Sequence, residues 1–287
     1  MSTISERASS TTTETRRPLS PSLIVGTALV GATVLLAAVS LVWTPHALTD
    51  VGSGGRLARP SGEFWLGTDR LGRDVFTQFM AAARSALIVA TCSVAIATLL
   101  GTVIGVAAAA SIRVVDELLS ALVDVLIAFP TLLLAMLVVT VRGASLSSAI
   151  LAIGIAGSAV IARVTRVNTA RVLREEYVTA GIVAGSGWSG LIRRHVVPNV
   201  APTLLVQMTL LGGASILAEA SLSYLGLGPA PPAPSWGRML LEAQSTVSSQ
   251  PWAAIAPGLA IAATVLGLNL LGDGLRETFD PQLRRAR

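Results

Sequence analysis

Long apolar runs separated by short polar segments constrain this chain more than any other feature of its sequence. Each run has about 20 residues, the length at which an α-helix crosses the hydrocarbon core of a bilayer. Backbone polar groups in lipid must be satisfied within their own segment, so such spans have to be helical. The sequence therefore predicts an all-α, polytopic bundle of about six transmembrane helices. The expected spans are about Leu23–Trp43, Ser85–Ala110, Leu118–Val141, Leu146–Val164, Val200–Leu222 and Trp252–Leu271.

The charged residues are few and lie between these runs. They make up 13% of the chain, well below the roughly 25% of soluble domains. All 21 basic residues are Arg, and they cluster at the ends of apolar runs, where they set topology and meet lipid head groups. They form no stripe interleaved with aromatic residues of the kind that binds nucleic acid. The composition thus predicts a multi-pass protein of the cell membrane, with lipid and not nucleic acid around it.

Arginine counts predict the orientation of the chain in the membrane. With the N-terminus inside the cell, the segments on that side hold 14 Arg and the opposite loops hold seven, which favours cytoplasmic termini. Five Arg of the first loop oppose this bias: Arg56, Arg59, Arg70, Arg73 and Arg84.

The expected segments are a disordered cytoplasmic tail (1–20), a first helix with an external loop (21–84), a transmembrane core (85–275) containing a cytoplasmic segment (165–199), and a second cytoplasmic tail (276–287).

Residue types suited to catalysis or cofactor binding are scarce. The chain has one Cys, Cys92, and two His, His46 and His195, which are far apart in sequence; neither an HExxH nor a CxxC motif occurs. A phosphate-binding loop of the GxxxxGK[ST] type needs a Lys, and the chain contains no Lys. We therefore expect no catalytic residue, no cofactor and no metal site. Any ATP hydrolysis has to belong to another subunit.

The polar segment between the fourth and fifth expected spans is the most informative part of the chain. Two adjacent acids suit the N-terminal end of a short helix, which Gly185 can end. Ser189 can cap a second short helix, which carries two Arg and is stopped by Pro198. Two short helices joined by a turn would form a rigid knob. This knob is either a docking element for a partner or an ordinary cytoplasmic loop made basic for topology.

Several motifs in this segment and around it occur in a fixed order. They are Leu66–Asp74, Leu122–Leu126 followed by Phe129 and Pro130, Glu176 to Ala180 and Gly185, Arg193 to Asn199, Glu219–Gly228, Pro234–Gly237, Asn269–Arg276, and Asp280 with Pro281. Together they resemble the dipeptide/oligopeptide/nickel group of bacterial ABC importer permeases, and specifically the second of the two permease subunits in such systems. The resemblance runs from about residue 64 to residue 285, which is most of the chain.

The resemblance implies a fold, a function and partners. The fold is that of a type I ABC importer transmembrane domain, with 85–275 as the core permease domain. The function is that of a permease subunit that forms, with a second homologous permease, the pathway for dipeptides or oligopeptides. An extracytoplasmic substrate-binding protein would deliver them, and cytoplasmic ATPase subunits that bind ATP and Mg would supply the energy. Nickel or another small solute is the alternative cargo.

The resemblance also assigns residues 165–199 as the segment that couples to the ATPase, hereafter the coupling segment. The residues concerned are Glu175, Glu176, Tyr177, Thr179, Ala180, Gly181, Gly185, Arg193, Arg194 and Pro198. One departure stands out, because the family commonly has Glu-Ala-Ala where this chain has Thr179-Ala180-Gly181. A salt bridge from the first of these positions to the ATPase is therefore not expected, and Glu175 or Glu176 would have to replace it.

Four charged residues of the first loop, Asp69, Arg70, Arg73 and Asp74, are close in sequence. They either pair locally and hold the start of the second span, or contact an extracytoplasmic binding protein. Both interpretations are open at the level of the sequence.

Two acids lie in or near the apolar spans, and an ionisable group at membrane depth is a functional hypothesis by default. Asp124 and Glu219 are therefore candidates for a pathway or gating role. Glu219 could instead be solvated or act as a cap at the outer end of its span. Pro130, which interrupts the third span, is expected to bend it and help to shape a cavity.

Two other classes fit parts of the pattern. An ion-coupled secondary transporter would use Asp124 and Glu219 as ion or proton sites, but we find no clear internal repeat of the kind such carriers show. An intramembrane protease would need a Gly-x-Gly-Asp element or a Ser and His paired in the membrane. Gly272-Asp273 lacks the first Gly of that element, and both His lie outside the expected spans.

Overall fold

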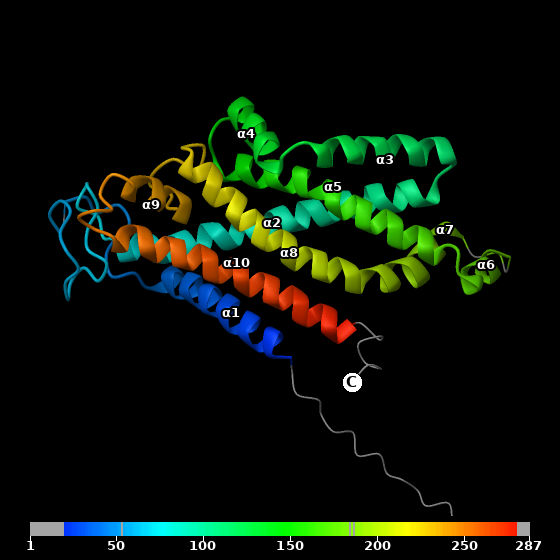
Figure 1. The fold of residues 1–287 in the computed structure, drawn as a ribbon, viewed down its shortest axis with the longest axis horizontal. Helices are drawn as coiled ribbons and strands as arrows, with labels where there is room; N and C mark the ends of the chain where they lie inside the picture. Colours follow the sequence, from blue (N-terminus) through cyan, green and yellow to red (C-terminus); the bar gives the residue numbers. More distant parts are fainter. Residues whose placement is uncertain (1–19, 53, 184, 186, 280–287) are drawn as a thin grey trace, which may run out of the picture.

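The computed structural model describes residues 20–52, 54–183, 185 and 187–279, and its long helices run side by side in one elongated bundle (Figure 1). The helices are α1 (Pro21–Val42), α2 (Val75–Ala110), α3 (Arg113–Ala128), α4 (Thr131–Arg142), α5 (Leu146–Val172), α6 (Glu176–Val183), α7 (Trp188–Leu191), a π-helical turn (Ile192–Val196), α8 (Val197–Tyr224), α9 (Trp236–Ala243) and α10 (Trp252–Phe279). The described ranges contain no strand beyond one isolated bridge between Thr68 and Asp74. Residues 1–19 and 280–287, most of the two expected tails, lie outside the described residues.

Five helical stretches are long and apolar enough to cross a membrane: α1, α2, α5, the continuous stretch Trp188–Tyr224, and α10. The pair α3 and α4, which is bent by 89° at a short break, makes a sixth span if the two helices are counted together. The break falls at Pro130, the residue that precedes the first turn of α4. The predictions of an all-α bundle with about six spans and of a bend at Pro130 are confirmed.

The long helices run between two chemically different ends (Figure 1). The loop of residues 43–74 and helix α9 lie at one end, and α6 and α7 lie at the other. Helix α1 lies beside α10, where the buried hydroxyls of Thr33 and Thr264 are 2.8 Å apart. We call these ends the external end and the coupling end, after the orientation that the arginine counts favour.

Close contact between α2 and α5 forms the centre of the bundle. A Cβ on Gly101 would lie 2.6 Å from the carbonyl oxygen of Ser158, and one on Gly105 would lie 2.5 Å from that of Ala162. Any larger residue would force the two backbones apart, so these glycines set the helix separation. This confirms the prediction that the Gly-x-x-x-Gly pattern of the second span is a packing face.

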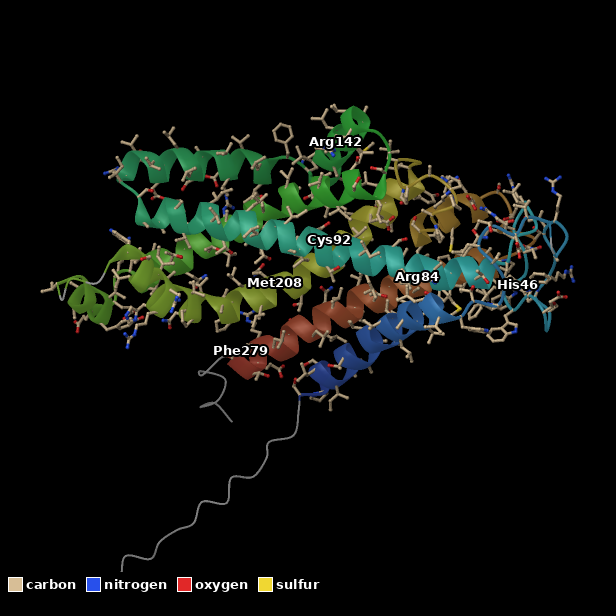
Figure 2. All side chains as sticks on the ribbon, turned by 180° about the vertical axis from the view of Figure 1, so that it is seen from behind. His46, Arg84, Cys92, Arg142, Met208 and Phe279 are labelled. Carbon is tan, nitrogen blue, oxygen red and sulfur yellow. The ribbon has the colours of Figure 1, made fainter. Side chains whose placement is uncertain are left out.

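Helix α2 begins ten residues before the span expected at Ser85. The reason is Asp74, whose side chain accepts hydrogen bonds from the backbone N–H groups of Phe76 and Thr77 at 3.0 and 3.2 Å and so caps the helix. Arg84, counted above with the external loop, therefore lies within α2 and donates to the Ser40 hydroxyl of α1 at 2.5 Å (Figure 2). Four and not five of the Arg that oppose the predicted orientation therefore lie in the external loop.

The Pro-rich segment before the last span was expected to be a loop, but it contains helix α9. Ser235 caps this helix by accepting from the backbone N–H of Arg238 at 3.2 Å. The indole of Trp236 is buried against α2 and donates to the Phe79 carbonyl at 3.2 Å. Helix α9 is thereby fixed on the first turns of α2. At the other end of the last span, α10 continues to Phe279 rather than ending near Leu271.

Candidate functional sites at the two ends of the bundle

At the coupling end, the chain leaves α5, forms α6 and turns sharply into α7. The backbone carbonyl of Glu175 accepts from the N–H groups of Val178 and Thr179 at 3.0 and 3.2 Å and starts α6. Gly185 has a φ of +83°, a conformation that glycine adopts without strain, and it lies in the turn after α6. The predicted pair of short helices around Gly185 is confirmed.

A small apolar cluster holds this part of the coupling segment on the bundle. Val178 of α6 and Leu191 of α7 are almost completely buried, and they cluster with residues from the ends of α5 and α8. The Tyr177 ring lies 5.4 Å from the His195 ring, centroid to centroid, and its hydroxyl accepts from the Asn199 amide at 3.4 Å. Packing of apolar side chains, with few polar contacts, therefore fixes the two short helices.

The outward side of the coupling segment carries most of the residues expected there. Tyr177, Val183 and Trp188 are 45%, 84% and 53% exposed, an unusual amount of apolar surface for so short a stretch. The exposed polar and small residues are Glu175, Glu176, Thr179, Ala180, Gly185, Arg193, Arg194 and Pro198, and Gly181 is half-buried. Among the described residues, none of the two Glu and two Arg in this set has an ion-pair partner. The surface is both apolar and free to form ion pairs.

Two local predictions for this segment are wrong. Gly187, not Ser189, occupies the position before α7, and Pro198 does not stop the second helix. Instead the chain passes through the π-helical turn directly into α8, and Pro198 lies in the first turn of α8. Proline has no backbone N–H, so Pro198 contributes no donor to the hydrogen bonds of this junction. The wide π-turn lets α7 and α8 join without a gap.

At the external end, Asp69 organises the loop before α2. Its Oδ1 accepts from the backbone N–H groups of Leu71 and Arg73 at 2.8 and 2.9 Å. Its Oδ2 accepts from the Arg73 guanidinium at 2.7 Å and from the Gln78 amide at 3.1 Å. One carboxylate thus ties the turn to the start of the second span, as the local-pairing interpretation predicted.

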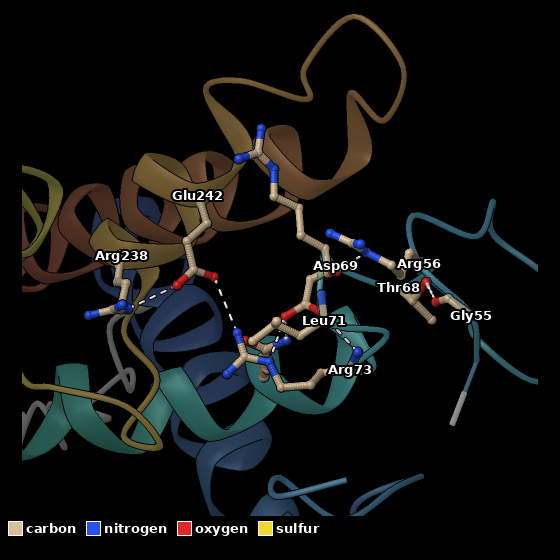
Figure 3. A network of polar contacts seen from close by, with 10 residues as sticks. Gly55, Arg56, Thr68, Asp69, Leu71, Arg73, Arg238 and Glu242 are labelled. Atoms are coloured by element: carbon tan, nitrogen blue, oxygen red, sulfur yellow. Dashed lines mark hydrogen bonds and ion pairs between the residues drawn. The ribbon is translucent and has the colours of Figure 1, made fainter. Parts of the chain in front are cut away.

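The same pairing extends to helix α9, which is more than 160 residues away in sequence (Figure 3). The Arg73 guanidinium lies 3.5 Å from Oε2 of Glu242, whose Oε1 accepts from Arg238 at 2.9 Å. The guanidinium of Arg70 donates to the Ser245 hydroxyl just beyond α9. A chain of alternating charges therefore joins the loop of residues 43–74 to α9.

Asp74, the last charged residue of the cluster predicted in this loop, is buried. Besides capping α2, its Oδ2 accepts from the Thr77 hydroxyl at 2.6 Å and lies 3.1 Å from Nδ1 of His46. The His46 ring stacks on Phe64 with a centroid distance of 4.6 Å. Asp74 therefore anchors both sides of the loop, and it lies too deep to meet a partner directly.

The two intramembrane acids have different surroundings. Asp124 of α3 is 60% exposed and pairs with Arg163 of α5. The neighbouring Asp116 pairs with Arg166, with a distance of 2.7 Å between Oδ2 and Nη2. Glu219 of α8 is only 2% exposed and accepts from the Ser223 hydroxyl at 2.6 Å. The interpretation of Glu219 as solvated is therefore wrong, and no contact brings the two candidate pathway acids together.

Sequence reasoning missed the partners of these candidate residues. Glu242 and Arg238 of α9, and Arg163 and Arg166 of α5, complete the pairs described above. A local signal was present for α9, because Ser235 precedes an Arg and a Glu spaced four apart, a pattern typical of a capped helix. No local signal connects Arg163 with Asp124, because the two lie on different helices.

A helical bundle with exposed apolar side chains on two short helices at one end, a loop held by ion pairs at the other and no phosphate-binding lysine is typical of the membrane subunit of a multi-protein transporter. Comparisons with known proteins identify the family. Residues 101–285, more than half of the chain, match the family described as binding-protein-dependent transport system inner membrane component. The chain belongs to this family.

Three relatives illustrate the similarity. A dipeptide transport system permease protein from Alkalihalophilus pseudofirmus is 36% identical over 91% of this chain and 86% of its own length. A glutathione transport system permease protein from Pectobacterium atrosepticum is 39% identical over 78% of this chain and 75% of its own. A di/tripeptide transport system permease protein from Pseudomonas aeruginosa is 40% identical over 78% and 74%.

The chain is therefore a multi-pass inner-membrane permease subunit of an ABC importer. Permeases of this kind work with a second permease, an ATPase and a binding protein. Membership of the family decides against the two other classes considered above, the ion-coupled carrier and the intramembrane protease. The cargo and the roles of individual residues are matters for proposal.

Proposed function

We propose that this chain forms, with a second permease subunit, the pathway for dipeptides or short oligopeptides delivered by an extracytoplasmic binding protein. The observation that carries the proposal is the set of relatives named for dipeptide, di/tripeptide and glutathione transport, matched over most of the chain. The external end would face the binding protein, and both termini would be cytoplasmic.

Energy would enter at the coupling segment. Its exposed Tyr177, Val183 and Trp188 provide apolar surface for a groove of the ATPase. Glu175, Glu176, Arg193 and Arg194, which have no ion-pair partner among the described residues, are available for pairs with that subunit. Because Leu191 and Val178 bind the short helices to the ends of α5 and α8, a displacement of the knob would move both helices. ATP and Mg would be bound by the ATPase and not by this chain.

A peptide-uptake assay with the complete importer in proteoliposomes tests both parts of the proposal. Labelled di- and tripeptides should accumulate only with ATP and binding protein present. Replacing Gly185 with Trp, or deleting residues 177–187, should leave the protein in the membrane and abolish uptake. Gly143→Trp is the matched control, because Gly143 also has a positive φ, of +89°, and open space around it, but lies in the turn between α4 and α5.

The possible outcomes test the peptide cargo and the coupling role separately. ATP-driven uptake of another solute but not of peptides would refute the cargo. Unchanged peptide uptake by the Gly185→Trp protein would refute the coupling role. Equal loss in both glycine variants would show that backbone strain, and not the coupling surface, causes the defect.

A further inference from the structure

A cavity of about 310 Å³ lies at the external end, between the loop of residues 43–74 and helix α9. Its floor is apolar and includes the buried side chains of Val75, Met239 and Ala243. Its rim is charged and includes Asp69, Arg70 and Glu242. An apolar recess with a few convergent polar groups is the usual form of a small-molecule site, and this volume is at the lower end of the range for such sites.

The two Arg that line this cavity, Arg70 and Arg73, have different partners. Arg73 lies between the carboxylates of Asp69 and Glu242, and Glu242 also pairs with Arg238 (Figure 3). Arg70 is different, because the Ser245 hydroxyl is the one side-chain partner of its guanidinium within the described ranges. Among the described residues, Arg70 is therefore the Arg of this lining without a carboxylate partner, and its exposed guanidinium lies at the rim.

We propose that this cavity binds the C-terminal end of a short peptide, with the α-carboxylate on Arg70 and the last side chain against the apolar floor. The planar guanidinium of Arg matches a carboxylate in geometry as well as in charge. An acidic side chain of a docked protein could also pair with Arg70, but it would leave the apolar floor unfilled. A recess of this size suits one or two residues of a free peptide.

The place of the loop in the comparisons supports a link to peptides. Residues 43–74 lie outside the family-wide match of residues 101–285, so the loop is no part of what defines the whole family. They lie inside the match to the dipeptide permease, which covers 91% of the chain. The inference rests on the proposed peptide transport and adds a recognition site on the permease itself.

Photo-crosslinking to the complete importer in nanodiscs, without the binding protein, tests the site. The probe is a dipeptide of Ala and a diazirine analogue of Leu, and the matched probe is its C-terminal amide. The acid should label the floor around Met239 and Ala243. Labelling should be about tenfold weaker with the amide and with the Arg70→Gln protein, because each loses the charged pair.

Arg59→Gln is the matched control variant. Arg59 is an exposed Arg of the same loop, but it does not line the cavity, so this variant should be labelled like the wild type. Equal labelling by acid and amide, or unchanged labelling of the Arg70→Gln protein, would overturn the proposal. So would the finding that Arg70→Gln weakens association with the peptide-free binding protein while no peptide labels the cavity, since the carboxylate would then come from that partner.

Peptide uptake by the wild-type importer separates this inference from the proposed function. Uptake of peptides without labelling of the cavity would overturn the site and leave the transport function standing. Failure of the importer to take up peptides would overturn the function, whatever the labelling.

Discussion

Different kinds of interaction stabilise the external end and the coupling end of this permease. At the external end, side-chain hydrogen bonds and ion pairs join segments that are far apart in sequence, as in the link from Arg73 to Glu242 and the bond from Gln250 to the carbonyl of Ala58. At the coupling end, a few apolar side chains hold the two short helices in place, and within the described residues Glu175, Glu176, Arg193 and Arg194 have no ion-pair partner. Directional polar bonds fix one geometry, whereas a small apolar cluster leaves the outward surface free for a partner.

The difference suits the role that we propose for each end. An external loop that receives a ligand gains from being preorganised, because ordering it on binding would reduce affinity. A segment that transmits motion needs a firm base and an unsatisfied outer face. Val178 and Leu191 form that base, and Tyr177, Val183 and Trp188 form the outer face.

The largest effect is expected when the orientation of the two ends is tested. In a Cys92→Ala background, Ser61→Cys should react with a membrane-impermeant maleimide on intact cells, because Ser61 is exposed in the external loop. Val183→Cys, in the coupling segment, should react only after the membrane is opened. The expected result is all or none. Labelling of Val183→Cys on intact cells would reverse the proposed topology.

A second test separates the base of the coupling segment from its face. Leu191→Ala removes a side chain that is 1% exposed, and such truncations typically cost about 2–5 kcal/mol. Trp188→Ala removes one that is 53% exposed, so the local packing should be nearly unchanged. Hydrogen exchange of residues 176–196 should therefore accelerate strongly for Leu191→Ala alone.

ATPase association provides the other half of this test. Trp188→Ala should weaken association of the ATPase although its hydrogen exchange is normal, because it removes apolar contact surface. If Trp188→Ala accelerates exchange as much as Leu191→Ala does, the distinction between base and face is wrong.

The sequence predicted features that depend on local pattern and missed those that depend on contacts between distant segments. Apolar run length gave the spans, Pro130 gave the break, and Gly101 and Gly105 gave the packing face. The partners Glu242 and Arg163 could not be predicted, because nothing local says which helices meet. Pro198 misled because a π-turn, which has no simple sequence signal, joins α7 to α8. Ser189 misled because α7 already begins at Trp188, so that Gly187 precedes the helix.

A third, smaller effect concerns the anchor of the external end. Asp74→Ala removes the cap of α2 and leaves His46 and Thr77 without their carboxylate partner. Loss of a cap costs about 0.5–2 kcal/mol, so the thermal midpoint of the purified permease should fall. Asp74→Asn keeps an oxygen acceptor for the cap and should lose less. Equal midpoints for Asp74→Ala and the wild type would show that the cap does not stabilise this end.

The smallest effect is expected for the longest ion pair in the external charge chain. Arg73 and Glu242 are 14% and 34% exposed, and their closest N and O atoms are 3.5 Å apart. Partly exposed pairs of this kind contribute about 0.2–1 kcal/mol. A double-mutant cycle with Arg73→Gln and Glu242→Gln, read by thermal unfolding, should give a coupling energy in this range that declines as salt is added. The single variant Arg73→Gln should destabilise more than Glu242→Gln, because the second pair that it breaks, with Asp69, is less exposed than the pair with Arg238 that Glu242→Gln breaks. If the coupling energy is zero at low salt, the geometry of this end is set by the Asp69 turn and by the packing of Trp236, and the charge chain is a consequence of that geometry and not its cause.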